Sequence, residues 1–199
     1  MRKFPIEKSG KRSQCWQDLF VYNICGTGGT YIEIGGSWPI KNSNTYGLEK
    51  FAYYKGFSIE LDKETYFDSW LSSRKNKIYW DNALTFNYKE ATKENNMPMH
   101  INYLSCDIEP PSNTFNALKK VISDGLTFDV ITFEHEKFKS DQDYNKLATE
   151  LLNDNGYKVA VSDVWHKETS RIFETWYVKK TINFKEKTFD SWKTINNIK

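Results

Sequence analysis

Acidic residues recur where the short apolar segments of this chain end. Glu60, Asp81, Asp107 and Glu134 each follow a run of apolar and β-branched residues, and His135 comes directly after Glu134. A buried carboxylate costs free energy unless it is paired or used. Ligands of open α/β sheets bind beyond the carboxyl ends of the strands. The repeated acids at predicted strand ends therefore indicate one shared cleft.

The segment Thr30-Tyr-Ile-Glu-Ile-Gly-Gly36 predicts a first strand that ends in a glycine turn. Gly35 and Gly36 let the backbone turn tightly and approach a ligand closely. Glu33 lies inside the strand, where its charge needs a partner, either a ligand ammonium group or backbone amides. The turn is not the GxGxxG pattern of dinucleotide-binding proteins, and by itself it also fits an ordinary strand-to-helix connection.

The next two acids have the chemistry to bind a nucleoside. Glu60 follows Gly35 by 25 positions and can accept hydrogen bonds from both ribose hydroxyls. Asp81 can accept from an adenine amino group, while Asn82 or Ala83 supplies backbone amides. Together with the glycine turn, these acids predict an adenosine-like ligand.

Proton transfer is expected at the later strand ends, where Asp107, Glu109, Glu134 and His135 are the candidate bases. His135 has the natural pKa for a base at neutral pH. Adjacent strand residues face opposite ways, so Glu134 and His135 reach one cleft only if both lie beyond the strand. A histidine bonded within a loop is the alternative. Asp107, Glu134 and His135 could instead hold Mg²⁺ or Ca²⁺, although we do not favour a metal.

Short apolar runs alternate with longer helical patterns, which predicts a mainly parallel sheet covered on both faces. The segment 164–170 is too short for a helical crossover, so the last two strands should form an antiparallel hairpin. Gly56 is expected to stop the helix of residues 44–55, and the polar stretch from Asp81 to Pro98 is expected to be irregular. Strands are predicted at 31–34, 57–61, 77–80, 101–106, 127–133, 157–163 and 171–178, and helices at 44–55, 63–73, 112–123 and 142–155.

The chain of 199 residues fits one domain, residues 13–178, between a basic extension (1–12) and a basic tail (179–199). The net charge is +2, and residues 1–13 and 179–199 each carry +4, which leaves −6 for residues 14–178. A domain that neutralises phosphates would be basic, so no nucleic-acid partner is expected. Three cysteines without a CxxC pair, and the absence of a long apolar run, predict a cytoplasmic protein without a membrane span.

Several motifs together resemble the FkbM family of methyltransferases. They are Ser13-Gln-Cys-Trp-Gln-Asp18, Tyr31-Ile-Glu-Ile-Gly-Gly36, Ser43-Asn-Thr-Tyr-Gly-Leu-Glu49, Gly56-Phe-Ser-Ile-Glu60 and Asn102-Tyr-Leu-Ser-Cys-Asp-Ile-Glu109. The match covers residues 13–178. Two later segments, Val130-Ile-Thr-Phe-Glu-His-Glu136 and Phe173-Glu-Thr-Trp-Tyr177, resemble a branch met in marine phages and bacteria.

The resemblance implies a Rossmann-like class I methyltransferase fold, seven strands with an antiparallel C-terminal hairpin, that binds S-adenosylmethionine. It also implies O-methylation of a small-molecule or glycan hydroxyl, commonly on a sugar. It carries over Glu33, Gly35, Glu60 and Asp107 as cofactor-binding residues. We expect Gly36, Asn44, Asp81 and Asn82 in the same set, and His135, Asp107 and Glu134 as the catalytic residues. The unusual turn Gly36-Ser-Trp-Pro39 favours one alternative, a methyltransferase-like binding module without activity. A nicotinamide-dependent reductase is disfavoured by the turn sequence and the terminal hairpin.

Overall fold

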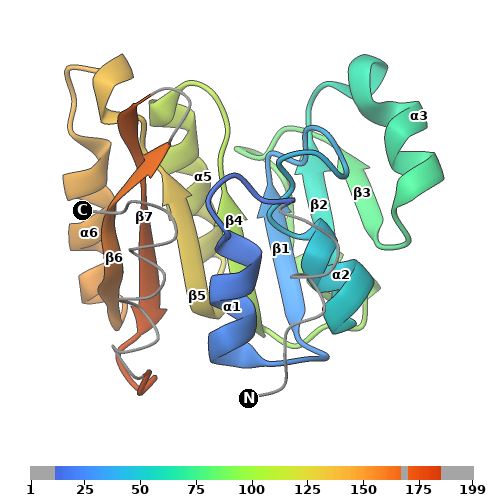
Figure 1. Ribbon diagram of the computed structural model, residues 1–199, viewed down its shortest axis with the longest axis horizontal. Coiled ribbons are helices and arrows are strands. Elements are labelled where there is room, and N and C mark those ends of the chain that lie inside the picture. Colours follow the sequence, from blue (N-terminus) through green and yellow to red (C-terminus); the bar gives the residue numbers. More distant parts are fainter. Residues whose placement is uncertain (1–11, 167–169, 185–199) are drawn as a thin grey trace.

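The computed structural model describes residues 12–166 and 170–184, which form one seven-stranded sheet with the order β3-β2-β1-β4-β5-β7-β6 (Figure 1). The two expected basic ends lie almost wholly outside the described residues. The strands are β1 (Thr30–Ile34), β2 (Lys55–Glu60), β3 (Lys77–Trp80), β4 (His100–Cys106), β5 (Thr127–Glu134), β6 (Tyr157–His166) and β7 (Arg171–Lys179).

The sheet is mainly parallel and ends in an antiparallel hairpin. Strands β1 to β5 pair in parallel, whereas β7 is antiparallel to both β5 and β6. The order of strands along the chain reverses direction between β1 and β4, which makes that junction the switch point where ligands bind in open α/β sheets. The predicted fold class and the predicted hairpin are both confirmed.

Helices cover both faces of the sheet because its strands alternate their side chains. In β1, Ile32 and Ile34 join the core beneath α4, α5 and α6, whereas Tyr31 joins the core beneath α1 and α2. Helix α3 lies at the β3 edge of the sheet (Figure 1). The helices are α1 (Gln17–Cys25), α2 (Tyr46–Ala52), α3 (Lys63–Ser73), α4 (Tyr88–Glu94), α5 (Pro111–Ser123) and α6 (Tyr144–Asp154), with a short 3₁₀ helix η2 at Lys137–Lys139.

Two helices were not predicted, and one helix ends earlier than expected. The stretch expected to be irregular contains α4, which begins at Tyr88. The side chain of the preceding residue, Asn87, accepts a hydrogen bond from the backbone N–H of Glu90. Helix α1 lies ahead of the first predicted strand. Helix α2 stops at Tyr53, which has a left-handed backbone (φ 60°), and not at Gly56, which lies within β2. Each unpredicted helix is short, seven or nine residues, and offers little periodicity to detect.

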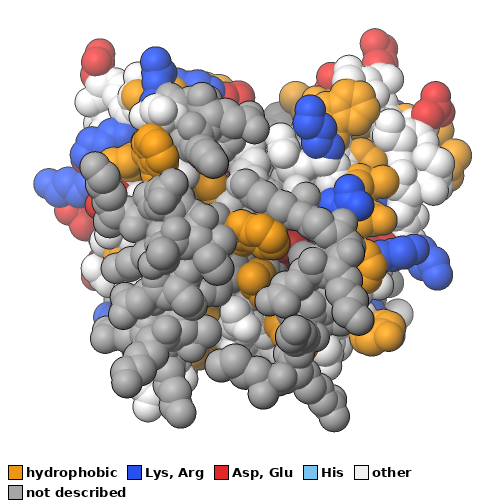
Figure 2. Space-filling view, in the orientation of Figure 1, with side chains coloured by type: hydrophobic (Ala, Val, Ile, Leu, Met, Phe, Trp, Pro, Cys, Tyr) orange, Lys and Arg blue, Asp and Glu red, His pale blue; other side chains and the backbone are white. Residues whose placement is uncertain are grey.

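Some apolar surface remains exposed on the described part of the chain. Hydrophobic side chains gather around α3 in the space-filling view (Figure 2), and Leu61, Phe67 and Leu71 are exposed there. None of the helices within residues 12–166 and 170–184 combines the length and the apolar character needed to cross a membrane.

Candidate active site

Two adjoining cavities open at the carboxyl ends of β1, β2, β3 and β4. The larger has a volume of about 510 Å³ and the smaller about 110 Å³. Gly35, Ser37 and Asp107 line both, so the two cavities meet at the switch point between β1 and β4. The sequence analysis predicted a cleft at this edge of the sheet, and the structure has one.

Gly35 is required because two backbones approach each other at the junction. Its φ is +88°, and a Cβ atom there would lie 1.7 Å from the carbonyl oxygen of Asp107. The N–H groups of Gly35 and Gly36 both donate to the carbonyl of Ile59, which ties the turn to β2. Gly36 lines only the smaller cavity, and a Cβ there would lie 3.1 Å from the Trp70 ring. The glycine pair thus lets β1, β2 and β4 converge around one space.

Glu60 lines the larger cavity with its carboxylate held by backbone amides. Its Oε2 accepts from the N–H of Ser37 (2.8 Å), and its Oε1 accepts from the N–H groups of Leu61 (2.8 Å) and Asp62 (2.9 Å). A carboxylate has about four acceptor sites. Oε2 therefore keeps a lone pair for a ligand hydroxyl, while the three amides fix the orientation of the group.

Asp81 and Asn82 form the far end of the larger cavity. Both are exposed and follow β3. Asp81 Oδ1 accepts from the N–H of Asn82 (2.7 Å), and Asn82 Oδ1 accepts from the N–H of Leu84 (2.9 Å). Ala83 and Leu84 add apolar lining beside them. This end offers hydrogen-bonding groups next to an apolar wall, which suits an aromatic base.

The smaller cavity is lined by polar groups that suit an ammonium ion. Glu33 is 2% exposed, and its Oε2 accepts from the hydroxyls of Thr45 (2.9 Å) and Ser58 (2.6 Å). Burial raises the pKa of Glu33, and the charge of Arg74 and these hydroxyls oppose that rise. Asn44 is buried and donates to Ser105 Oγ (3.1 Å), but its Oδ1 has no partner among the described residues. A buried carbonyl oxygen without a donor costs free energy, which an ammonium ligand would recover.

Asp107 and Glu134 share a hydrogen bond between their side chains at the ends of β4 and β5. Burial raises the pKa of both, and the charge of Asp107 raises that of Glu134 further. The pair is best described as a charged Asp107 that accepts from a protonated Glu134. Asp107 lines both cavities, whereas Glu134 lines neither and lies behind it.

His135 lies apart from these carboxylates. It is 1% exposed and lines neither cavity; the N–H of Lys137 donates to its Nδ1 (3.3 Å). Burial lowers the pKa of His135 to about 4. It follows the last residue of β5, and its backbone N–H donates to the Phe173 carbonyl (2.8 Å). Among the described residues no group of three His, Cys, Asp or Glu side chains is arranged to hold a metal ion, so Asp107, Glu134 and His135 do not form the trio considered above.

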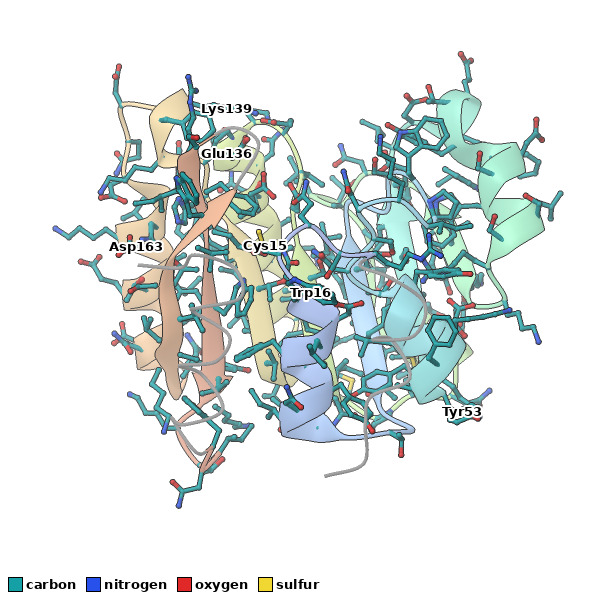
Figure 3. The ribbon with its side chains drawn as sticks, in the orientation of Figure 1. Cys15, Trp16, Tyr53, Glu136, Lys139 and Asp163 are labelled. Atoms are coloured by element: carbon teal, nitrogen blue, oxygen red, sulfur yellow. The ribbon has the colours of Figure 1, made fainter. Side chains whose placement is uncertain are left out.

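The rim beyond β5 is held together by ion pairs. Lys139 Nζ contacts Glu136 (2.6 Å) and also bonds to Glu109. Lys139 and Glu136 lie together at the same end of the sheet as the cavities (Figure 3). Glu109 lines the larger cavity, so this bridge connects the wall of the cavity to the loop after β5. The carboxylate of Glu109, one of the candidate bases, is therefore paired with Lys139.

Several lining residues were not predicted. Gln14 lines the smaller cavity from the segment before α1, and Lys41 and Ser105 line it from other segments. Ser37 lines both cavities with a left-handed backbone, φ +40°. The Ser13–Asp18 motif was a usable signal for Gln14, because the resemblance had drawn attention to it. No pattern in the sequence pointed to Lys41.

No family model and no curated sequence matches this chain. Several solved structures with a similar fold are described as methyltransferases. A protein from Clostridium thermocellum described as a candidate rRNA methylase matches with TM-score 0.57 at 12% identity, over 87% of this chain and 99% of its own. A candidate tRNA (m1A22) methyltransferase from Streptococcus pneumoniae, in complex with S-adenosylmethionine, matches with TM-score 0.57 at 9% identity, over 85% and 74%. Magnesium protoporphyrin IX methyltransferase from Synechocystis, also with the cofactor bound, matches with TM-score 0.54 at 10% identity, over 83% and 79%.

These comparisons correct one expectation. We predicted that nucleic acid is not a partner. This prediction is wrong, because neighbours with a similar fold are described as rRNA and tRNA methyltransferases. The prediction depended on the net charge of residues 14–178. A summed charge describes long-range attraction to phosphates and does not exclude a class of acceptor. At these identities the comparisons establish the fold, which is that of class I methyltransferases.

Proposed function

We propose that this protein is an S-adenosylmethionine-dependent methyltransferase. The observation that carries the proposal is the pair of cavities that meet at Gly35 and Asp107. One is lined by the acids suited to a nucleoside, and the other by the acceptors suited to an α-amino group. S-adenosylmethionine has these two ends, joined at the sulfur.

Each end of the cofactor has residues to hold it. In the larger cavity, Glu60 accepts from a ribose hydroxyl, and Asp81 with Asn82 faces the adenine. In the smaller cavity, Asn44 Oδ1 and the Glu33 carboxylate receive the ammonium group. When bound, S-adenosylmethionine supplies an electrophilic methyl group on a sulfonium sulfur. The shared lining of the two cavities near Asp107 is where that methyl group would be presented.

Asp107 is the residue placed to take the proton of an attacking hydroxyl. It lines both cavities, and its pKa is raised above that of a free aspartate, in the direction of neutral pH. A base works best when its pKa lies near the working pH. Glu134 stays protonated and orients Asp107 by donating to it. We do not retain His135 in this role, because it lines neither cavity.

The acceptor class that we propose is a sugar or glycan hydroxyl, and it depends on the resemblance to the FkbM family alone. RNA joins the acceptors to be tested because two of the neighbours are described as RNA methyltransferases. Incubation with methyl-labelled S-adenosylmethionine and separate panels of glycans, small glycosides and RNA would identify the acceptor. Cofactor binding with no transfer to any panel would favour the inactive binding module.

The proposal is tested first by calorimetry with S-adenosylmethionine, S-adenosylhomocysteine and NAD. We expect the first two to bind and NAD not to bind; failure of both methyl-cycle ligands would refute the proposal. Glu60→Ala should weaken both by about 10–100-fold, since a hydrogen bond to a charged group contributes about 1.5–3 kcal/mol. Glu64→Ala removes an acid that lines neither cavity and should leave both affinities unchanged.

A further inference from the structure

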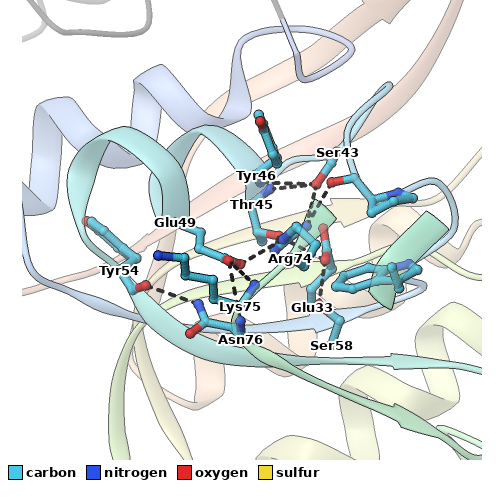
Figure 4. Close-up of polar contacts among 12 residues, drawn as sticks. Glu33, Ser43, Thr45, Tyr46, Glu49, Tyr54, Ser58, Arg74, Lys75 and Asn76 are labelled. Atoms are coloured by element: carbon cyan, nitrogen blue, oxygen red, sulfur yellow. Dashed lines mark hydrogen bonds and ion pairs between the residues drawn. The ribbon is translucent and has the colours of Figure 1, made fainter. Parts of the chain in front are cut away.

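Arg74 is a buried arginine whose N–H groups are all engaged. Its side chain is 1% exposed, and it directly follows α3. The guanidinium binds side chains and a carbonyl from three other parts of the chain, several of which are drawn in Figure 4. Its partners are Glu49 Oε2 (2.7 Å), the Pro39 carbonyl (3.0 Å), Ser43 Oγ (3.3 Å), Tyr31 Oη (2.8 Å) and Thr45 Oγ1 (2.8 Å). Such a set fixes the positions of its partners, because the planar fork has one fixed geometry.

Three of these partners belong to the segment 39–45, which forms one wall of the smaller cavity. Lys41, Asn42, Ser43 and Asn44 line that cavity, whereas Arg74 lines neither cavity. The segment has no strand or helix of its own to hold it, apart from a single bridge between Ser13 and Asn42. Arg74 therefore supports this wall from behind.

Arg74 also reaches the other wall of the smaller cavity through one hydroxyl. Thr45 Oγ1 accepts from Arg74 and donates to Glu33 Oε2, so the three groups form a chain. The positive charge of Arg74 counters the effect of burial on Glu33. A charged Glu33 is the form that attracts an ammonium group. One residue thus controls both the shape and the charge of this cavity.

We propose that Arg74 is a positioning residue that assembles the amino-acid half of the cofactor site without touching the ligand. The inference deepens the proposed function and rests on it. Arg74 holds the 39–45 wall, which carries Asn44, and its charge favours the ionised form of Glu33. None of its hydrogen-bond partners lines the larger cavity; its approach to that side is the stacking on the Trp70 ring, 4.5 Å away, whose Nε1 donates to the Ser37 carbonyl. We therefore expect recognition of the nucleoside half to depend on Arg74 much less than recognition of the amino-acid half.

Two ligands that contain the same nucleoside distinguish binding to the amino-acid half of the site from binding to the nucleoside half. S-adenosylhomocysteine carries the amino-acid end, and 5′-methylthioadenosine replaces that end with a methyl group. Binding of both to the wild type and to Arg74→Met should be measured by calorimetry. We expect Arg74→Met to weaken S-adenosylhomocysteine by about 10–100-fold, the range for hydrogen bonds to a charged group, and 5′-methylthioadenosine by less than about threefold. Arg74→Lys keeps the charge but not the fork and should recover part of the loss.

Two further variants keep the test decisive if Arg74→Met folds poorly. Thr45→Val removes the hydroxyl between Arg74 and Glu33 and should give a smaller loss that is again confined to S-adenosylhomocysteine. Tyr157→Phe is the matched control: it removes a buried hydroxyl that accepts from the N–H of Phe128, away from both cavities, and should lower stability without changing the affinity ratio.

The outcomes distinguish this inference from the proposed function. An equal loss of both ligands in Arg74→Met and Thr45→Val, or no loss in either variant, would overturn the positioning role alone. If the wild type binds neither ligand, the proposed function fails and the inference fails with it. A selective loss of S-adenosylhomocysteine supports both.

Discussion

The two halves of the site stabilise their acids in different ways. On the cofactor side, formed by the ends of β1 and β2, Glu33 and Glu60 are compensated by donors: an arginine, two hydroxyls and three backbone amides. On the acceptor side, formed by the ends of β4, β5 and β7, Asp107, Glu134 and Glu174 lie near one another, and burial raises the pKa of all three. There Asp107 and Glu134 share a proton between their side chains.

Glu174, on the acceptor side, shows that two donors do not outweigh burial there. It is 2% exposed and is the register partner of Glu134 across β5 and β7. Its Oε2 accepts from Gln17 Nε2 (2.9 Å) and Trp176 Nε1 (2.7 Å), and burial raises its pKa to about 8. On the cofactor side the charge of Arg74 and two hydroxyls oppose the effect of burial on Glu33, which favours its charged form for binding. Acids held by shared protons can exchange one, which is what methyl transfer to a hydroxyl requires.

The largest effect is expected from removing the one acid of the acceptor side that lines the cavities. Asp107→Asn keeps the size of the side chain and can still accept from Glu134, but it cannot take a proton. We expect kcat to fall by about 10²–10⁴-fold, the usual contribution of a general base, and affinity for S-adenosylhomocysteine to change by less than about tenfold. Steady-state kinetics with the acceptor identified by the labelled-methyl panels would measure both.

Glu134→Gln is the matched control for this prediction. Because Glu134 is already held protonated, a neutral glutamine resembles it and can still donate to Asp107. We expect most of the activity to remain. A loss in Glu134→Gln as large as that in Asp107→Asn would show that the two carboxyls exchange roles, and the assignment of the charge to Asp107 would be abandoned.

A smaller effect is expected on stability as a function of pH. The pKa of Glu174 is about 8 in the folded protein against an ordinary value of 4.5, so the folded state holds a proton that the unfolded state releases between these values. The contribution of this proton to the free energy of unfolding is present in full below about pH 4.5. It is lost as the pH rises to about 8, and it amounts to the order of a few kcal/mol. Glu174→Gln should decline less, because its amide oxygen can still accept from Gln17 and Trp176 without a proton to lose. Denaturant unfolding at pH 5, 6, 7 and 8 would compare the slopes; identical slopes would refute the raised pKa.

The cofactor side could be predicted from the sequence further than the acceptor side. The acids at the ends of β2 and β3 and the glycine turn follow from local patterns, since an apolar run that stops at an acid marks a strand end. The terminal hairpin followed from the length of one connection. The role of His135 stays a prediction, because the strand pattern left open whether it and Glu134 reach the same cleft.

The support for the site could not be predicted in the same way. Arg74 sits in a loop, and its partners come from β1, from the 39–45 segment and from α2, up to 43 positions away. Gln17 and Glu174 are 157 positions apart. The local pattern of the sequence does not reveal such contacts, because they form only once the sheet has brought the segments side by side.

The smallest effect tests whether the cofactor side depends on backbone rather than side-chain contacts. Ser37 has φ +40°, a left-handed value that is costly for a residue with a Cβ. Its backbone N–H donates to Glu60, and its carbonyl accepts from Trp70 Nε1 (2.8 Å), contacts that glycine keeps. Ser37→Gly should therefore stabilise the protein by about 0.5–1 kcal/mol, or raise Tm by about 1–4 °C, part of the relief being offset by the greater freedom of glycine in the unfolded chain. Thermal unfolding would measure this, with Ser37→Ala as the control that keeps the Cβ and should gain nothing. A loss of stability or of 5′-methylthioadenosine binding in Ser37→Gly would show that the serine side chain itself supports the turn, and the cofactor side would then depend on side chains as the acceptor side does.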